Sequence, residues 1–282
     1  MKRFVSYIFI FLVVAYLLWL IRPGFQGKLT GTFREHYIPQ SYLSLANYLS
    51  ADKKFYRTFW IPTVPGYSYY SFTHPQISAE DFFHVTSVAE VIHKLQPPSS
   101  ENLLQHLGVR YVFVPIDSEG KIFLTDRKYD AKKYQQTIQS VEKLSWLTPV
   151  GLFGDLYAFQ VANPKDHFWL VTKDGKEKQV SYAFINPTKY SVNLQNIQSG
   201  DRLVFSESYD KNWEISKLQT TSQKYENLFN SFVLPKSGSY SVTVAYGLQK
   251  WVDIGMWISI ISGAGIIAAI IDLQLFLRKN HS

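Results

Sequence analysis

Two long apolar runs, one at each end of the chain, constrain this sequence more than any other feature. Residues 4–21 carry no charged side chain, and residues 254–277 carry only one, Asp272. A helix rises 1.5 Å per residue, so the 18 residues of the shorter run reach roughly 27 Å, close to the thickness of a bilayer's hydrocarbon core. The sequence therefore predicts an N-terminal transmembrane anchor over residues 1–22 and a C-terminal transmembrane helix with a basic tail over residues 251–282.

A cleaved signal peptide is the alternative for the first run, because Met1-Lys2-Arg3 is a basic start. The run is longer than the usual apolar part of a signal peptide, about 7 to 15 residues, and Ile21–Phe25 offers no pair of small residues for cleavage. An uncleaved anchor is therefore favoured. Two crossings would put both termini on one side of the membrane and the central region on the other. The basic residues that flank the two runs are balanced, so charge does not decide the orientation.

Composition excludes several classes of protein. The chain of 282 residues has no cysteine, which excludes disulfide scaffolds and cysteine-ligated metal sites. In residues 23–252, 24 basic side chains are balanced by 20 acidic ones, which argues against binding to nucleic acid. The sequence contains no glycine-rich phosphate-binding loop, no zinc-protease motif and no nucleophile-elbow motif of hydrolases. The histidines are scattered and not set at the spacing of metal ligands. We expect no cofactor and no metal.

The central region divides into two units by its pattern of apolar residues. In residues 23–163 helical and strand periodicities alternate, which predicts a small α/β unit. The expected helices are 39–50, 78–95, 100–106 and 131–144, and the expected strands are 56–61, 110–115 and 156–161. In residues 164–250 short strands recur about every ten residues between turn signals, which is typical of a β-sandwich. Its expected strands are 168–171, 179–184, 190–194, 202–207, 229–234 and 240–246, with a hairpin turn at Asp174-Gly175.

Three acidic residues are candidates for catalysis. Glu35 follows the first span closely, where a carboxylate could act as general base on a lipid-linked substrate. Glu80 and Asp81 stand in the first turn of an expected helix, where carboxylates also favour the helix dipole. Structural roles are the favoured alternative for all three: an exposed linker for Glu35, and a helix start for the other two. Asp117 and Glu119 likewise suit a turn before a glycine.

Two further groups of residues suggest contacts. An aromatic-rich stretch between prolines could stack on sugar rings, although packing in a core or at the membrane interface is favoured; its glycan-contact candidates are Trp60, Tyr67, Tyr69 and Tyr70. In the C-terminal run a ridge of small residues could receive another helix, such as the first span; it consists of Gly255, Ser259 and Gly263. Asp272 is either a functional carboxylate within the membrane or an interfacial one.

Several segments together resemble a known family. They read Arg-Thr-Phe-Trp-Ile-Pro at 57–62, Leu-Gly-Val-Arg-Tyr-Val-Phe-Val-Pro at 107–115, Asn-Pro-Thr-Lys-Tyr at 186–190, a strand and turn at 203–213, and a last strand at 240–246 that runs into a span. These segments are similar to the C-terminal extracytoplasmic region of YfhO-type bacterial membrane proteins, which are large polytopic proteins similar to the GT-C glycosyltransferases. The resemblance covers nearly the whole chain. It implies an extracytoplasmic central region, both termini in the cytoplasm, and a connection to polyprenyl-phosphate sugars.

The chain also departs from that family. Its members carry many spans before this region, together with an early outer loop whose acidic residues are expected to perform transfer. Only one span precedes the region here, so no catalytic residue carries over and the chain could be the tail of a split gene. Tyr209, Asp210 and Trp213 match a Tyr-x-x-x-Trp segment of the family. A turn at a strand end, anchored by a buried tryptophan, explains that match better than sugar binding.

The sequence thus predicts a membrane-anchored α+β protein of the cell envelope, with two transmembrane helices flanking a small α/β unit and a β-sandwich. The expected role is that of an accessory or glycan-binding module in the assembly of envelope glycan or lipid-linked sugars, not catalytic by itself. Its expected partners are the membrane, a polytopic membrane protein, and envelope glycan or a polyprenyl-phosphate sugar. One alternative is a self-sufficient glycosyltransferase or hydrolase that uses Glu35, Glu80 or Asp81. The other is a structural envelope protein or a gene fragment.

Overall fold

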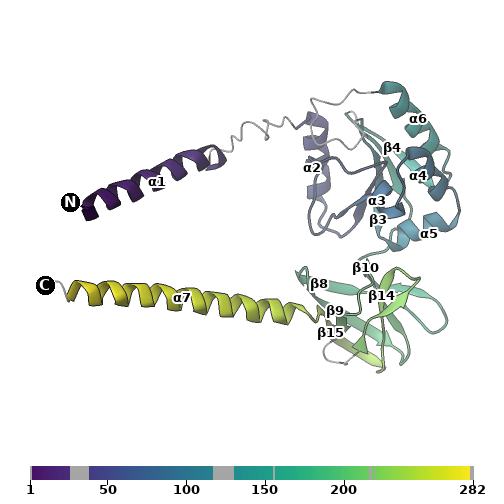
Figure 1. Cartoon of the computed structure of the whole chain (residues 1–282). Helices are drawn as coiled ribbons and strands as arrows, with labels where there is room; N and C mark the ends of the chain where they lie inside the picture. Colours follow the sequence, from purple (N-terminus) through teal and green to yellow (C-terminus); the bar gives the residue numbers. More distant parts are fainter. Residues whose placement is uncertain are drawn as a thin grey trace.

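The chain folds into two lobes and two long end helices (Figure 1). The computed structural model describes residues 2–25, 38–116, 130–154, 156–215, 218 and 220–279. The helices α1 (Lys2–Phe25) and α7 (Gln249–Lys279) extend from the same side of the lobes in Figure 1. One lobe mixes helices with a sheet and the other is built from strands alone, so the predicted mixed α+β class is confirmed.

The first lobe is a five-stranded sheet of order β2-β1-β3-β5-β4 with helices on both faces. Its strands are β1 (Arg57–Trp60), β2 (Gln76–Ser78), β3 (Val109–Val114), β4 (Leu147–Phe153) and β5 (Leu156–Val161). The first three are mutually parallel, and β5 and β4 continue the sheet antiparallel. Its helices are α2 (Gln40–Ala51), α3 (Ala79–Phe83), α4 (Val88–Leu95), α5 (Ser99–His106) and α6 (Ala131–Glu142).

Burial explains why this sheet needs helices on both sides. All four residues of β1 are buried, as expected for a strand of a parallel sheet covered on both faces. On one face α2 contributes Tyr42, Leu45 and Leu49, which recur at helical spacing. On the other face the core includes apolar residues from α4, α5 and α6. Both faces are therefore closed to solvent by amphipathic helices.

The sequence-based element boundaries need two corrections in this lobe. The single helix expected over 78–95 is two helices, because His84 adopts a left-handed conformation (φ 54°) and ends α3. Ser87 then caps α4, its hydroxyl accepting from the amide of Glu90 at 3.3 Å. Strands β2 and β4 were not expected. Pro149 and Gly151 argue against a strand in general, but β4 is at the edge of the sheet, where both are tolerated.

The second lobe is a pair of packed five-stranded sheets, as the β-sandwich interpretation predicted. One sheet has the order β13-β14-β10-β6-β7 and the other β12-β11-β15-β9-β8. The strands are β6 (Phe168–Val171), β7 (Glu177–Gln179), β8 (Ser181–Asn186), β9 (Lys189–Ile197), β10 (Arg202–Ser208), β11 (Trp213–Ile215), β12 (Thr220–Thr221), β13 (Gln223–Tyr225), β14 (Phe229–Val233) and β15 (Gly238–Tyr246). Side chains of both sheets share one core, in which Phe168 and Phe205 face Val192 and Val244.

One helix of the described chain is long and apolar enough to cross a membrane. It is the part of α7 from Gln249 to Ile270, with 22 residues and a mean hydropathy of 1.8. In α1 the apolar stretch with described side chains runs from Phe11 to Arg22, which is shorter than the roughly 20 residues a span requires. A membrane helix at the C-terminal end is therefore supported by length and composition. The N-terminal span over residues 1–22 remains a prediction.

The two lobes are joined by a seam that is apolar at one end and polar at the other. Leu104 and Leu107, from the end of α5, share a core with Trp169, Val204 and Phe229 of the sandwich. Beside this core the Arg57 guanidinium donates to the Leu107 carbonyl at 2.7 Å, to the Ser206 hydroxyl at 2.9 Å and to the Glu207 carboxylate at 2.7 Å. One buried side chain thus links both lobes.

Gly108 allows the two lobes to approach closely at this seam, and its replacement is expected to lower the stability of the fold. Its φ is +70°, and a Cβ there would lie 2.9 Å from the Lys165 carbonyl oxygen. We expect Gly108→Ala to lower the free energy of unfolding by about 1–2 kcal/mol, because it adds left-handed strain to a close contact. Urea unfolding of the full chain in detergent would measure this. Gly66→Ala is the control, since a Cβ there meets nothing within 4 Å; an equal loss in both variants would contradict the explanation.

Candidate functional site

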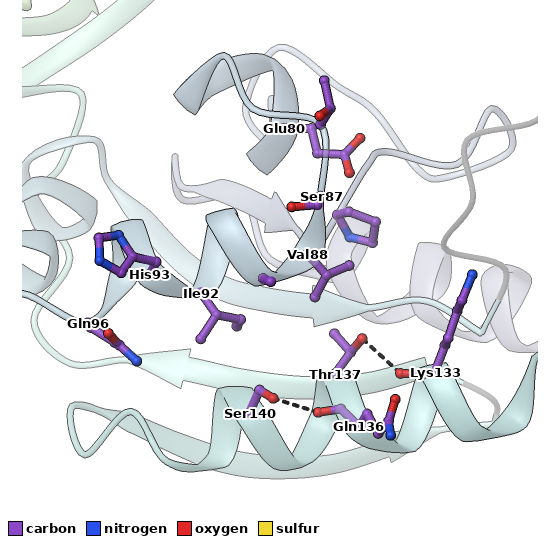
Figure 2. Close-up of a pocket in the computed structure, with 13 residues that line it drawn as sticks. Glu80, Ser87, Val88, Ile92, His93, Gln96, Lys133, Gln136, Thr137 and Ser140 are labelled. Atoms are coloured by element: carbon purple, nitrogen blue, oxygen red, sulfur yellow. Dashed lines mark hydrogen bonds between the residues drawn. The ribbon is translucent and has the colours of Figure 1, made fainter.

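A wide groove lies between α4 and α6 in the first lobe (Figure 2). It has a volume of about 900 Å³, and its wall combines apolar side chains, such as Val88 and Ile92, with hydroxyl, amide and charged ones. In Figure 2 Glu80 lies at the top, above Ser87, His93 lies at the left and Lys133 at the right, with Thr137 and Ser140 along α6 below. Both α6 hydroxyls donate to their own helix, to the Lys133 and Gln136 carbonyls.

Glu80 is the sequence-predicted catalytic candidate that lines this groove. Burial, reinforced by the nearby carboxylates of Asp81 and Glu90, raises the pKa of Glu80. A carboxyl group that holds its proton could act as a general acid, but that role needs a reacting partner within about 3 Å. The nearby Ser87 hydroxyl is bonded to Glu90 at 2.9 Å as part of the α4 cap. This contact assigns the Ser87 hydroxyl to the helix cap and away from Glu80.

Asp81 belongs to a helix start, the structural role that the sequence favoured. The Asp81 amide donates to the Ser78 hydroxyl at 3.4 Å, so Asp81 stands in the capped first turn of α3, and its side chain is exposed. Glu35, Asp117 and Glu119 lie outside the described residues. Within the described residues no group of three or more His, Cys, Asp or Glu side chains is placed to hold a metal ion.

The aromatic stretch divides between the core and the surface. Trp60 is fully buried, with its indole N–H donating to the Thr58 hydroxyl at 3.0 Å, so its prediction as a glycan contact is wrong. The ring of Tyr67 packs edge-on against that of Tyr42 at a centroid distance of 4.4 Å, which places Tyr67 at the edge of the core. Tyr69 is likewise half-buried against that core, whereas Tyr70 is 59% exposed. The favoured packing role thus holds for the first three residues.

A second hollow, here called the interlobe cleft, lies where this loop meets the sandwich. It has a volume of about 340 Å³, within the range of small-molecule sites, and both lobes contribute to its wall. Its aromatic lining is Phe55, Phe72, Tyr182, Phe184 and Tyr190, and its charged or titratable lining is Lys53, Lys54, Asp166 and His167. The rings of Phe72 and Phe184, one from each lobe, stack at a centroid distance of 5.9 Å.

His167 is the unusual member of the cleft wall. Its side chain is buried among the rings of Phe55, Tyr190 and Phe205, at centroid distances of 4.0 to 5.0 Å. Neither ring nitrogen has a hydrogen-bond partner among the described residues, and Nε2 lies 3.6 Å from the Glu207 carboxylate, beyond hydrogen-bond distance. A buried polar group without a partner is rare, which makes this position a candidate for ligand contact.

Asp166 provides the adjacent acceptor. Its Oδ1 accepts from the Tyr182 hydroxyl at 3.0 Å and from the His167 amide at 2.7 Å. Burial, followed by the charge of Asp166 and this hydrogen bond, raises the pKa of Tyr182, so the phenol stays protonated as a donor. Sequence analysis missed the cleft, although Asp166-His167 lies two residues after the Asn163-Pro164 boundary between the two units.

The family-like Tyr-x-x-x-Trp segment has a structural role. Asp210 accepts from the Asn212 amide at 2.9 Å and from the Tyr246 hydroxyl at 2.8 Å. Trp213 packs edge-on against Phe205 at 4.8 Å in the sandwich core. The interpretation as a strand-end turn anchored by a buried tryptophan is confirmed.

The ridge of small residues on α7 has no neighbour in the described chain. The Ser259 hydroxyl donates to the Gly255 carbonyl at 2.9 Å, and a Cβ placed on Gly255 or Gly263 would meet nothing within 4 Å. The expected packing of the first span on this ridge is therefore not seen.

Comparison with known proteins gives no match: no family model, no curated protein and no solved structure matches the chain.

Burial of His167 predicts a pH dependence of stability. Burial, with a smaller contribution from the Arg57 charge, holds the pKa of His167 well below its usual 6.5. Below pH 6.5 the unfolded chain binds a proton that the folded chain does not, so stability falls as pH decreases. Between pH 7 and 5.5 this group should account for about 1 kcal/mol of lost unfolding free energy. Unfolding of wild type and His167→Gln at both pH values tests this; an unchanged pH dependence in the variant would contradict it.

Proposed function

We propose that the protein is a membrane-anchored glycan-binding module whose interlobe cleft holds a sugar. The observation that carries the proposal is the combination in one cleft of aromatic rings with the buried, unpartnered His167. Sugars present apolar C–H faces that suit aromatic rings and hydroxyls that need fixed donors and acceptors. Asp166 and the lysines at positions 53 and 54 provide such groups beside the rings.

The membrane part of the proposal is supported by α7. Its described side chains from Trp251 to Ile270 are almost all exposed to the surroundings, which an apolar helix tolerates in lipid or against another membrane protein. In this proposal the central lobes lie outside the cytoplasm, both termini lie inside, and a polytopic membrane protein docks on the spans. The resemblance to the tail of YfhO-type, GT-C-like proteins supports a role in envelope glycan or lipid-linked sugar assembly.

A non-catalytic role is favoured over a self-sufficient enzyme. Glu80, in the groove between α4 and α6, has a raised pKa, but the neighbouring Ser87 hydroxyl is engaged in the cap of α4. Asp81 is exposed in the first turn of α3. The residues to which we assign a role are therefore those that line the interlobe cleft and would bind a sugar.

Binding of defined oligosaccharides by the full chain in detergent tests the proposal. The probes are oligosaccharides of glucose, galactose and N-acetylglucosamine, measured by titration calorimetry. Asp166→Asn should weaken binding about tenfold or more, because a hydrogen bond to a charged group contributes about 1.5–3 kcal/mol. Asp174→Asn, in an exposed hairpin turn, is the matched control and should leave binding unchanged. Absence of binding to every probe, or equal affinity of Asp166→Asn and wild type, would overturn the proposal.

A further inference from the structure

Exposed apolar side chains gather at the end of the sandwich from which α7 leaves. The Tyr246 amide donates to the Thr188 carbonyl at 2.9 Å, so the turn between β8 and β9 lies beside the last residue of β15. Just before this turn Phe184 and Ile185 are 43% and 51% exposed. Since α7 begins at Gln249, three residues after Tyr246, these two side chains lie close to the start of the apolar helix.

The loop of the first lobe reaches the same place. Phe72 is 58% exposed and stacks on Phe184 at 5.9 Å. Tyr70, also exposed, contacts Phe72 with a centroid distance of 6.3 Å. Tyr70, Phe72 and Phe184 therefore form a continuous row of exposed rings across both lobes, and the exposed Ile185 follows Phe184 in the chain; these four residues are here called the aromatic seat.

The start of α7 continues this apolar character. Leu248 and Trp251 are exposed, and the Lys250 ammonium lies 5.6 Å from the Trp251 ring centroid. Tryptophan and tyrosine are enriched where a membrane protein crosses the headgroup region, and lysines extend toward that region from helix ends. A contiguous exposed apolar surface marks an interaction site. Because the aromatic seat is continuous with the first turns of α7, it lies where this apolar helix would enter the bilayer.

We propose that the aromatic seat inserts into the headgroup region of the leaflet that α7 enters, so that both lobes rest on the bilayer. This inference rests on the proposed anchoring by α7 and adds a second, peripheral contact. Two residues of the seat, Phe72 and Phe184, also line the interlobe cleft. The cleft would therefore open at the bilayer surface, where a ligand held in that leaflet could reach it.

The chain contains no cysteine, so single cysteines can be labelled with a nitroxide without background. Ile185→Cys and Tyr70→Cys report on the seat, and Ile258→Cys reports on α7. Ser199→Cys is the control, because it lies beyond the far end of β9, whose nine residues span about 30 Å. The full chain is placed in vesicles of phosphatidylethanolamine and phosphatidylglycerol. Collision rates of each label with oxygen and with a water-soluble nickel complex then give its depth.

We expect positions 185 and 70 at headgroup depth, position 258 deeper and position 199 in water. If the labels at positions 185 and 70 are as exposed to water as the label at position 199, while the label at position 258 is deep, the insertion of the aromatic seat is overturned and the anchoring by α7 stands. If position 258 is also in water, the anchor is wrong and the seat with it. If 185 and 70 are shielded from both collision reagents, a protein surface covers them, and the lipid assignment is overturned.

Discussion

Replacing Arg57 by alanine is expected to lower the free energy of unfolding by about 3 kcal/mol. Arg57 is 5% exposed and donates to Leu107, Ser206 and Glu207. The variant leaves the buried Leu107 carbonyl without this donor and removes the contact that links the lobes. The Glu207 carboxylate is partly exposed, so water offsets a share of the lost attraction. Thermal or urea unfolding of the full chain in detergent measures the loss.

Arg110 offers a matched control within the first lobe. It pairs with Asp52 at 2.6 Å, and both side chains are about one-third exposed. Arg110→Ala should therefore cost about 1 kcal/mol or less, because solvent screens the pair. Equal losses for the two arginine variants would contradict the view that burial of Arg57 is what joins the lobes.

Replacing Trp60 by alanine is expected to cost about 3–5 kcal/mol, because it empties a fully buried site of an aromatic side chain. Trp60 packs against Phe113 at 4.9 Å and against Tyr42 at 6.3 Å between centroids. The same unfolding measurement applies. A loss of this size is expected only if Trp60 belongs to the core and does not face a ligand.

Tyr70→Ala is the control for the tryptophan variant, since both residues come from the same aromatic stretch. Tyr70 is exposed, so its replacement should change the unfolding free energy by no more than about 0.5 kcal/mol in detergent. A small loss for Trp60→Ala, or a large one for Tyr70→Ala, would show that the two residues have been placed wrongly.

Sequence periodicity predicted the elements whose signals are local. Helix α2 shows apolar residues at helical spacing, and β15 buries Val242 and Val244 in strict alternation. The break between α3 and α4 was missed because the apolar pattern runs through it, although Ser78 and Ser87 are both capping residues.

The functional surfaces could not be predicted in the same way. Trp60 was grouped with the tyrosines that follow it, but the strand ends at Trp60 and the loop begins after it. The cleft depends on Phe72 of the first lobe meeting Phe184 of the second, a pair that joins segments far apart in the chain. Such pairings are set by the docking of the two lobes, which leaves no periodic trace in the sequence.

Protection of a cysteine in the interlobe cleft by bound oligosaccharide tests the central claim most directly. Thr73→Cys places a thiol in the cleft wall, and Gln136→Cys places one in the groove between α4 and α6. The rate of thiol alkylation is measured for the full chain in detergent, with and without the oligosaccharide that binds best. We expect the oligosaccharide to slow alkylation at position 73 and to leave position 136 unaffected. Protection at position 136 alone, or at neither position, would contradict the claim that the cleft is the glycan site.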